Sequence, residues 1–250
     1  MPVYRRGYQR YAGPVTAHRH RMLAFPRHAW KRLMEQRLVV LVMLASFFWP
    51  LLCAVFVYLS NRADLLQGFD KAFVAFLEVK GRFFLIFMNV QSAAAVILAA
   101  LAGPGLVAPD LTNNALPLYL SRPVSRFDYV LGRWLVLAAL LSPVTWIPGL
   151  LLFAIQSGMA GWGWFAANWR LGAGVLLGFA AWILLVSLVA LAGSALVRWR
   201  IIAGALVLAF FFVLAGAAQI IRQILRTEWS VLMDPGGAMY RIWSSLLGVE

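Results

Sequence analysis

A short polar segment, residues 110–133, interrupts a largely apolar chain and holds the side chains best suited to bind a partner. It reads DLTNNALPLYLSRPVSRFDYVLGR, so the polar residues Asp110, Asn113 and Asn114 are followed by a cluster of apolar ones. Leucine and tyrosine side chains that face water beside arginines are typical of a docking surface. The residues of this surface are Leu111, Leu116, Leu118, Tyr119, Leu120, Arg122 and Arg126. The alternative is a tightly capped connection between two helices that needs no partner.

Capping signals divide the polar segment into two elements. Asp110 follows Pro109, and a carboxylate in such a position can accept hydrogen bonds from the backbone amides two or three residues later. We therefore predict a short helix over about 110–121 that begins at Asp110 and is ended by Pro123. Ser125 and Asp128 have the spacing of a capping box, which predicts that the next helix begins there.

Patterns for catalysis and metal binding are absent from the sequence. It contains no P-loop pattern, no H-E-x-x-H and no G-x-S-x-G, and its three histidines all lie in the N-terminal tail. Cys53 is the single cysteine, so neither an intramolecular disulfide nor a thiolate pair for a metal can form. We therefore predict no enzyme and no cofactor bound by this chain, and a membrane-embedded enzyme is the weakest hypothesis.

The composition places the polar segment in a membrane protein. Of 250 residues, 63% are hydrophobic and 12% are charged, and the mean hydropathy is +0.81. Several apolar runs reach about 20 residues, the length that crosses the hydrocarbon core of a bilayer. The predicted fold class is an all-α polytopic helical bundle, with an amphipathic elbow helix at the N-terminus and a cytoplasmic helix between spans 2 and 3.

We predict three parts of the chain. Residues 1–37 form a basic tail with an amphipathic elbow helix, for which a solvated tail is the alternative. Residues 222–250 form a tail outside the cytoplasm, where apolar positions after Asp234 predict an interfacial helix. Residues 38–221 form the transmembrane domain, with spans at about 38–59, 83–108, 129–155, 171–197 and 201–221.

Several residues in these spans predict bends. Prolines and glycines free backbone groups or loosen a helix, and membrane helices tolerate this where the freed groups are buried or lie along a cavity. The expected positions are Pro50, Gly103-Pro104-Gly105, Ser142-Pro143 and Pro148-Gly149.

Other residues predict contacts and surface segments. Gly174 and Gly178 have the spacing of closely packed helices, and Asn89, Gln91 and Ser92 predict hydrogen bonds between helices. We expect a loop over 156–170 whose tryptophans anchor it at the membrane surface, and a short amphipathic helix within the loop 60–82.

The charge distribution predicts the orientation and the source of energy. With the N-terminus inside, the inner segments hold 14 of the 22 Lys and Arg residues, so we expect the N-terminus and the polar segment to face the cytoplasm. The net charge of +13 is concentrated in a tail that suits anionic membrane lipid and carries no motif for nucleic acid. Because no ionisable side chain lies in the middle of a predicted span, a proton-coupled pump is disfavoured and any energy must come from a partner.

The polar segment resembles the coupling-helix region of ABC-2 type transporter permeases, which in that family also lies between the second and third spans. The elbow helix, the order of the spans and the Gly-Pro-Gly triplet agree with the family, whereas Thr112-Asn113-Asn114 is neutral where the family often has a charge. The matching residues are Leu116, Tyr119, Leu120, Ser121, Arg122, Pro123, Arg126, Tyr129 and Gly132.

The resemblance implies the membrane-spanning subunit of an ATP-driven exporter in the cell (inner) membrane. It implies two permease subunits, identical or paralogous, and two separate ATPase subunits that carry ATP and Mg and dock on the cytoplasmic coupling helix. The predicted docking residues are Asp110, Asn113, Asn114, Leu116, Leu118, Tyr119, Leu120, Ser121, Arg122, Pro123 and Arg126.

Two further expectations accompany this hypothesis. The family usually has six spans and five are predicted here, so we expect the natural chain to continue past Glu250; the alternative is a branch of the family that ends outside the membrane after five spans. The second hypothesis is a non-transporting membrane scaffold that recruits cytoplasmic proteins through the polar segment. The apolar spans suit a lipid-like or amphipathic cargo, and they suit simple contact with lipid tails equally well.

Overall fold

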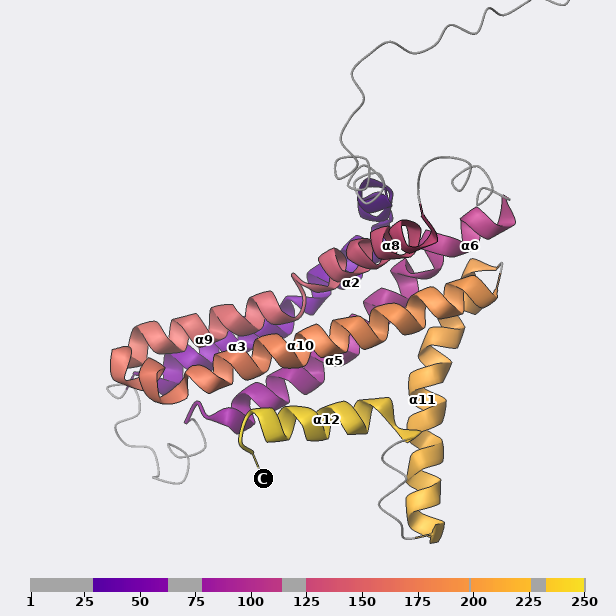
Figure 1. Cartoon of the computed structure of the whole chain (residues 1–250). Coiled ribbons are helices and arrows are strands. Elements are labelled where there is room, and N and C mark those ends of the chain that lie inside the picture. The colour runs from indigo at the N-terminus through magenta and orange to yellow at the C-terminus, as the bar shows by residue number, and fades with distance from the viewer. Residues whose placement is uncertain (1–28, 63–77, 114–124, 198, 226–232, 250) are drawn as a thin grey trace, which may run out of the picture.

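The computed structural model describes residues 29–62, 78–113, 125–197, 199–225 and 233–249. Within these ranges the regular structure is helical, which confirms the predicted fold class (Figure 1). The helices are α2 (Arg37–Ser46), α3 (Phe48–Ser60), α5 (Gly81–Ala102), α6 (Pro104–Thr112), α8 (Arg126–Leu141), α9 (Trp146–Ala160), α10 (Trp162–Leu196), α11 (Arg200–Leu225) and α12 (Pro235–Leu246).

Five helical runs in the described part of the chain are long and apolar enough to cross a membrane. They are Arg37–Ser60, Gly81–Thr112, Arg126–Ala160, Trp162–Leu196 and Arg200–Ile224. Each contains one of the five spans predicted from the sequence, apart from a residue or so at the ends. The chain is therefore a multi-pass helical membrane protein.

The predicted loop over 156–170 is wrong. α9 continues to Ala160 and α10 begins at Trp162, so Gly161 alone separates the two helices. Gly161 has a φ of 89°, a conformation that a residue without a Cβ atom adopts at little cost. Gln156, placed in the loop by the sequence, is buried in α9 and accepts a hydrogen bond from Asn61 Nδ2 at 2.7 Å.

The first span breaks at Phe47, three residues before Pro50. Proline has no N–H, so the Ser46 carbonyl loses its usual partner four residues later in the helix. Gln91 Nε2 from α5 donates to that carbonyl at 3.0 Å, and both Gln91 and Ser46 are buried. The predicted kink at Pro50 and the predicted interhelical hydrogen bond of Gln91 are both confirmed. Gln91 supplies the donor that the proline removes, so the kink is tolerated inside the protein.

The second and third spans are also divided, as predicted. Gly103 separates α5 from α6, and residues 142–145 separate α8 from α9. In the second break the Ser142 hydroxyl donates to the Ala138 carbonyl at 2.7 Å, and the Thr145 hydroxyl to the Leu141 carbonyl at 2.8 Å. Val144 and Thr145 are fully buried and Ser142 and Pro143 are half-buried, so the protein covers much of this irregular backbone.

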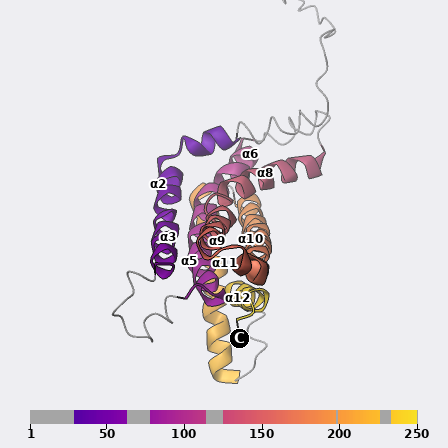
Figure 2. The ribbon, with the colours of Figure 1, turned by 90° about the vertical axis from the view of Figure 1, so that its left-hand side faces the viewer.

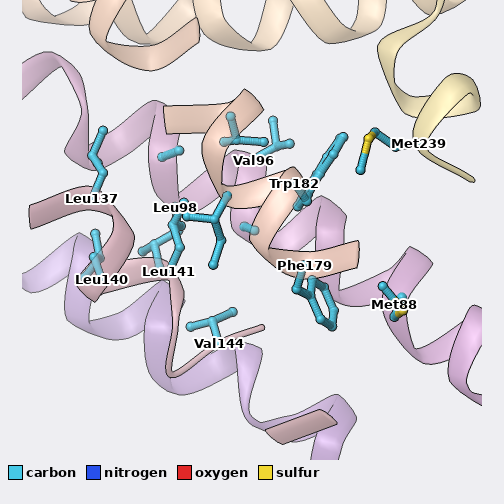
Figure 3. Packing of buried hydrophobic residues seen from close by; sticks show 14 of the residues in the cluster. Met88, Val96, Leu98, Leu137, Leu140, Leu141, Val144, Phe179, Trp182 and Met239 are labelled. Atoms are coloured by element: carbon cyan, nitrogen blue, oxygen red, sulfur yellow. The ribbon is translucent and has the colours of Figure 1, made fainter. Parts of the chain in front are cut away.

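The long helix α10 is the centre of the bundle and packs against α5, α6, α8, α9, α11 and α12. In Figure 3, Phe179 and Trp182 of α10 lie among side chains of α5 and α12, while Leu140 and Leu141 of α8 lie beside Leu98 of α5. All five side chains are buried. Small residues let the backbones approach, because a Cβ atom at Gly149 of α9 would lie 2.7 Å from a Val175 methyl group of α10.

Helix α12 follows Asp234, whose carboxylate accepts from the Gly236 amide at 3.0 Å as the helix cap. The helix was predicted from the sequence, but much of its apolar face packs on protein. Met239, Trp243 and Leu247 are buried against neighbouring helices, among them α10. The Trp243 indole donates to the Gly178 carbonyl at 3.2 Å, so the small-xxx-small pair of α10 lies against α12.

The outer helices are α2, α3 and α11. Figure 1 shows α11 leaving the bundle at a steep angle, and its second half exposes large apolar side chains such as Val213 and Ile224. Residues 29–34 are helical as well, with Leu33 buried, and Figure 2 shows this turn lying across the end of α2. The remainder of the predicted elbow helix, and the helix expected within 60–82, lie outside the described residues.

Candidate functional site

The candidate site is the end of the bundle where the second span leads into the third. The structure describes both flanks of the polar segment, including the predicted docking residues Asp110, Asn113 and Arg126. The other predicted docking residues lie outside the described residues: Asn114, Leu116, Leu118, Tyr119, Leu120, Ser121, Arg122 and Pro123. The described part of the site consists of the helix ends that hold the segment.

Asp110 does not cap a helix, so that prediction is wrong. The chain restarts as α6 directly after Gly103, with Pro104 in the first turn, and the helix runs through Pro109 to Thr112. Proline fits a first turn because the amides there need no partner within the helix. Asp110 is thereby placed near the C-terminal end of α6, and Asn113, whose amide donates to the Pro109 carbonyl at 3.0 Å, follows that end.

Asp110 instead joins α6 to α8. Its Oδ2 atom accepts a hydrogen bond from the Tyr129 hydroxyl at 2.7 Å and forms an ion pair with the Arg133 guanidinium. The Arg133 guanidinium also lies over the Tyr129 ring, 5.2 Å from its centroid. The side chains of Asp110 and Arg133 are each only 13% exposed. We call these three residues the Asp110 cluster.

The capping box predicted at the start of the third span is confirmed. The Ser125 hydroxyl accepts from the Asp128 amide at 3.1 Å, and the Asp128 carboxylate accepts from the Ser125 amide at 3.0 Å. α8 accordingly begins at Arg126, which is exposed. This box fixes where α8 begins, and Tyr129 and Arg133 of the Asp110 cluster lie in the first two turns of that helix.

Ser194 of α10 holds α6 from another side. Its hydroxyl accepts from the Ala108 amide at 2.9 Å and donates to the Pro104 carbonyl at 3.3 Å. These two backbone groups are four residues apart, so the hydroxyl is inserted into the hydrogen-bond ladder of α6. In the sequence Ser194 stands between two other small residues, Gly193 and Ala195, and it is not among the residues predicted above to form hydrogen bonds between helices. The hydroxyl was the signal that could have distinguished it.

A third contact joins α6 to α11. A Cβ atom at Gly105 would lie 3.5 Å from the central carbon of the Arg200 guanidinium, so the guanidinium packs on this glycine. Arg200 also donates to the Gln36 side chain, just before α2. α6 is therefore joined to α8 and α10 by polar side chains and packs against Arg200 of α11, and both ends of the polar segment start from this frame.

The chemistry of this frame is positioning. The Asp110 cluster uses its carboxylate, hydroxyl and guanidinium on one another, and the described residues contain no group of three or more His, Cys, Asp or Glu side chains that could hold a metal ion. What the arrangement can do is transmit a displacement of the polar segment to three spans at once.

Comparison with known proteins gives no family: no family model matches this sequence, and no curated protein matches it.

Proposed function

We propose that this chain is the permease subunit of an ABC-2 type ATP-driven exporter in the cell (inner) membrane, with its N-terminus in the cytoplasm. Two permease subunits, identical or paralogous, assemble with two ATPase subunits that bind ATP and Mg. The ATPases dock on residues 110–126. The permease contributes the path across the membrane and no catalytic group.

The observation that carries the proposal is the frame beneath the polar segment. The segment joins the second and third spans. The coupling helix of ABC-2 type permeases, which the segment resembles, lies in the same place. Its flanks are held together by the Asp110 cluster and anchored to α10 through Ser194. An external subunit that pushes on the segment therefore acts on a rigid base and not on a loose loop.

The frame also gives a route for coupling. ATP binding shifts the permease between two arrangements only if the docked ATPase contacts them differently. A displaced segment moves α6 and α8 together because Asp110 bridges them. It moves α10 because Ser194 is hydrogen-bonded within α6. α10 also packs against α5, α8, α9 and α11, which belong to the second, third and fifth spans. A displacement of α10 therefore affects most of the bundle.

Two substitutions in the polar segment test the proposal. Leu116→Asp and Tyr119→Ala should each weaken the affinity of the ATPase for the permease by about 30-fold, because removal of an interface hot spot costs about 2 kcal/mol. Less ATPase should then be recovered with the permease. ATP hydrolysis should also become independent of transport. The matched control is Leu65→Asp in the connection between α3 and α5, which should leave recovery unchanged.

The outcome also separates the exporter from the scaffold hypothesis. Stoichiometric recovery of a P-loop ATPase from cells that express the chain supports the exporter. If no ATPase is recovered, or if the two variants still assemble and transport normally, the docking assignment fails and a scaffold becomes the better explanation.

A further inference from the structure

A groove of about 670 Å³ lies between three helices at the same end of the bundle as the Asp110 cluster. Its walls come from the start of α2, the second half of α5 and the first half of α11, and none of the three residues of the Asp110 cluster lines it. This volume is that of a site for a small organic ligand.

The depth of the groove follows from small residues. A Cβ atom at Gly204 of α11 would lie 2.7 Å from the Ala100 carbonyl oxygen of α5, so the two backbones nearly touch. Larger side chains stand on either side of this contact, among them Leu38, Ile97 and Ile201, all of which are exposed. The groove is therefore lined mainly by apolar side chains around this close backbone contact, which suits a hydrocarbon chain.

One end of the groove is cationic. Gln36, Arg37 and Arg200 contribute to its lining, and none of its lining residues is acidic. Both arginines are exposed, and the Arg200 guanidinium is held in place by Gly105 and the Gln36 side chain. Guanidinium groups stay charged at any relevant pH and bind phosphate oxygens through paired N–H groups.

The two arginines lie at the boundary of the membrane. Arg37 is the first residue of the span Arg37–Ser60, and Arg200 is the first residue of the span Arg200–Ile224. The apolar walls therefore enter the hydrocarbon region directly below the two positive charges. Basic pockets between transmembrane helices at this depth recognise anionic lipid headgroups.

We propose that this groove binds one anionic phospholipid of the adjoining leaflet, with an acyl chain between α2, α5 and α11 and its phosphate on Arg37 and Arg200. The lipid bridges the two outer spans and fills the space between them. This site is independent of the transport proposal, because it needs only the groove, the charges and a membrane.

The test uses the full chain, purified and delipidated in a neutral detergent. Palmitoyl-oleoyl phosphatidylglycerol and phosphatidylcholine with the same acyl chains are added in turn, and native mass spectrometry counts the bound lipids. We expect one phosphatidylglycerol to bind at least about tenfold more tightly than phosphatidylcholine, because each arginine beside an anionic headgroup adds to its affinity. Equal binding of the two lipids by the wild-type protein would overturn the proposal without any variant.

Variants then locate the site. Arg37→Gln with Arg200→Gln should abolish the preference, whereas the matched pair Arg82→Gln with Arg170→Gln, exposed arginines near the other end of the bundle, should retain it. Ala205→Phe, which fills the groove, should reduce binding of both lipids. If Ala205→Phe instead converts a dimer to a monomer and leaves lipid binding intact, the groove holds a second copy of the chain and the proposal is wrong. If glycerol phosphate, which has no acyl chain, binds as tightly as phosphatidylglycerol and displaces it, the acyl chain plays no part and the proposal is again wrong.

Discussion

The ion pair between Asp110 and Arg133 provides the sharpest test of the frame beneath the polar segment. Both side chains are 13% exposed, and the carboxylate also accepts from the Tyr129 hydroxyl. We would replace Asp110 by Asn and Arg133 by Met, singly and together. Each single substitution leaves one charge in a site that excludes most water, whereas the double variant leaves none.

The expected magnitude follows from that burial. Removing one partner of a fully buried pair costs about 3–5 kcal/mol, and an exposed pair contributes about 0–1 kcal/mol. With a small part of each side chain in water, each single variant should lower the free energy of unfolding by about 3 kcal/mol. The double variant should lose about 4 kcal/mol, less than the sum of about 6 kcal/mol for the two single variants, which corresponds to a coupling energy of about 2 kcal/mol.

The assay is equilibrium unfolding in mixed detergent micelles, followed by far-ultraviolet circular dichroism. The chain supplies its own control in Glu78 and Lys80, an ion pair of 2.7 Å whose side chains are 57% and 68% exposed. Glu78→Gln with Lys80→Met should show a coupling energy of no more than about 0.5 kcal/mol. If the Asp110 pair couples no more strongly than this control, the cluster is not a desolvated link and the rigid frame is refuted.

Two further predictions concern helix packing and use the same unfolding assay. Gly178→Ala should destabilise the protein by about 1–3 kcal/mol, because the new methyl group meets the Met88 methyl group of α5 and the Trp243 indole of α12, whereas Gly216→Ala, with open space around it, should be neutral or stabilising by up to about 1 kcal/mol. A loss of stability at both glycines, or at neither, would show that crowding by these two side chains is not the cause. Gln91→Leu should cost about 1–3 kcal/mol because it leaves the Ser46 carbonyl buried without a donor. In a Pro50→Ala background, which restores an amide for that carbonyl, the cost should largely disappear, and an unchanged cost would disprove the explanation.

The spans and their breaks could be predicted because they depend on local composition. An apolar run of about 20 residues has few alternatives to crossing a membrane, and a proline removes a hydrogen bond wherever it stands in a helix. Hence Pro50 and the Ser142-Pro143 pair marked their breaks correctly. The capping box at Ser125 was also predictable, since all its groups lie within four residues.

The two wrong predictions, the helix cap at Asp110 and the loop over 156–170, came from residues that are compatible with more than one position in a helical structure. Asp110 has a side chain that can cap a helix. However, Gly103 only interrupts the second span, and α6 begins again at Pro104, so Asp110 lies near the C-terminal end of α6 and not at its start. The tryptophan-rich segment 162–169 suggested a surface loop, but tryptophan is also compatible with the first turns of a helix. A single Gly161 with positive φ is enough for the turn.

Long-range partners could not be predicted at all. Gly178 signalled a close helix contact without naming α12, and Asp110 and Arg133 are separated by 22 intervening residues that fix no distance in space. Ser194 and the backbone it enters lie more than eighty residues apart. The packing of the spans decides which residues meet. The sequence therefore shows each residue but not the residue that it contacts.

The polar links around α6 favour a movement in steps over a gradual one. Apolar surfaces slide with little change in energy, but Asp110 and Ser194 each lose specific hydrogen bonds when displaced, in a region where water replaces them poorly. A displacement of the polar segment must therefore either leave these links intact or exchange them together for a second set. In the first case α6, α8 and α10 move as one body. Because α10 runs without a break from the frame to the Trp243 contact, the motion must then appear at α12.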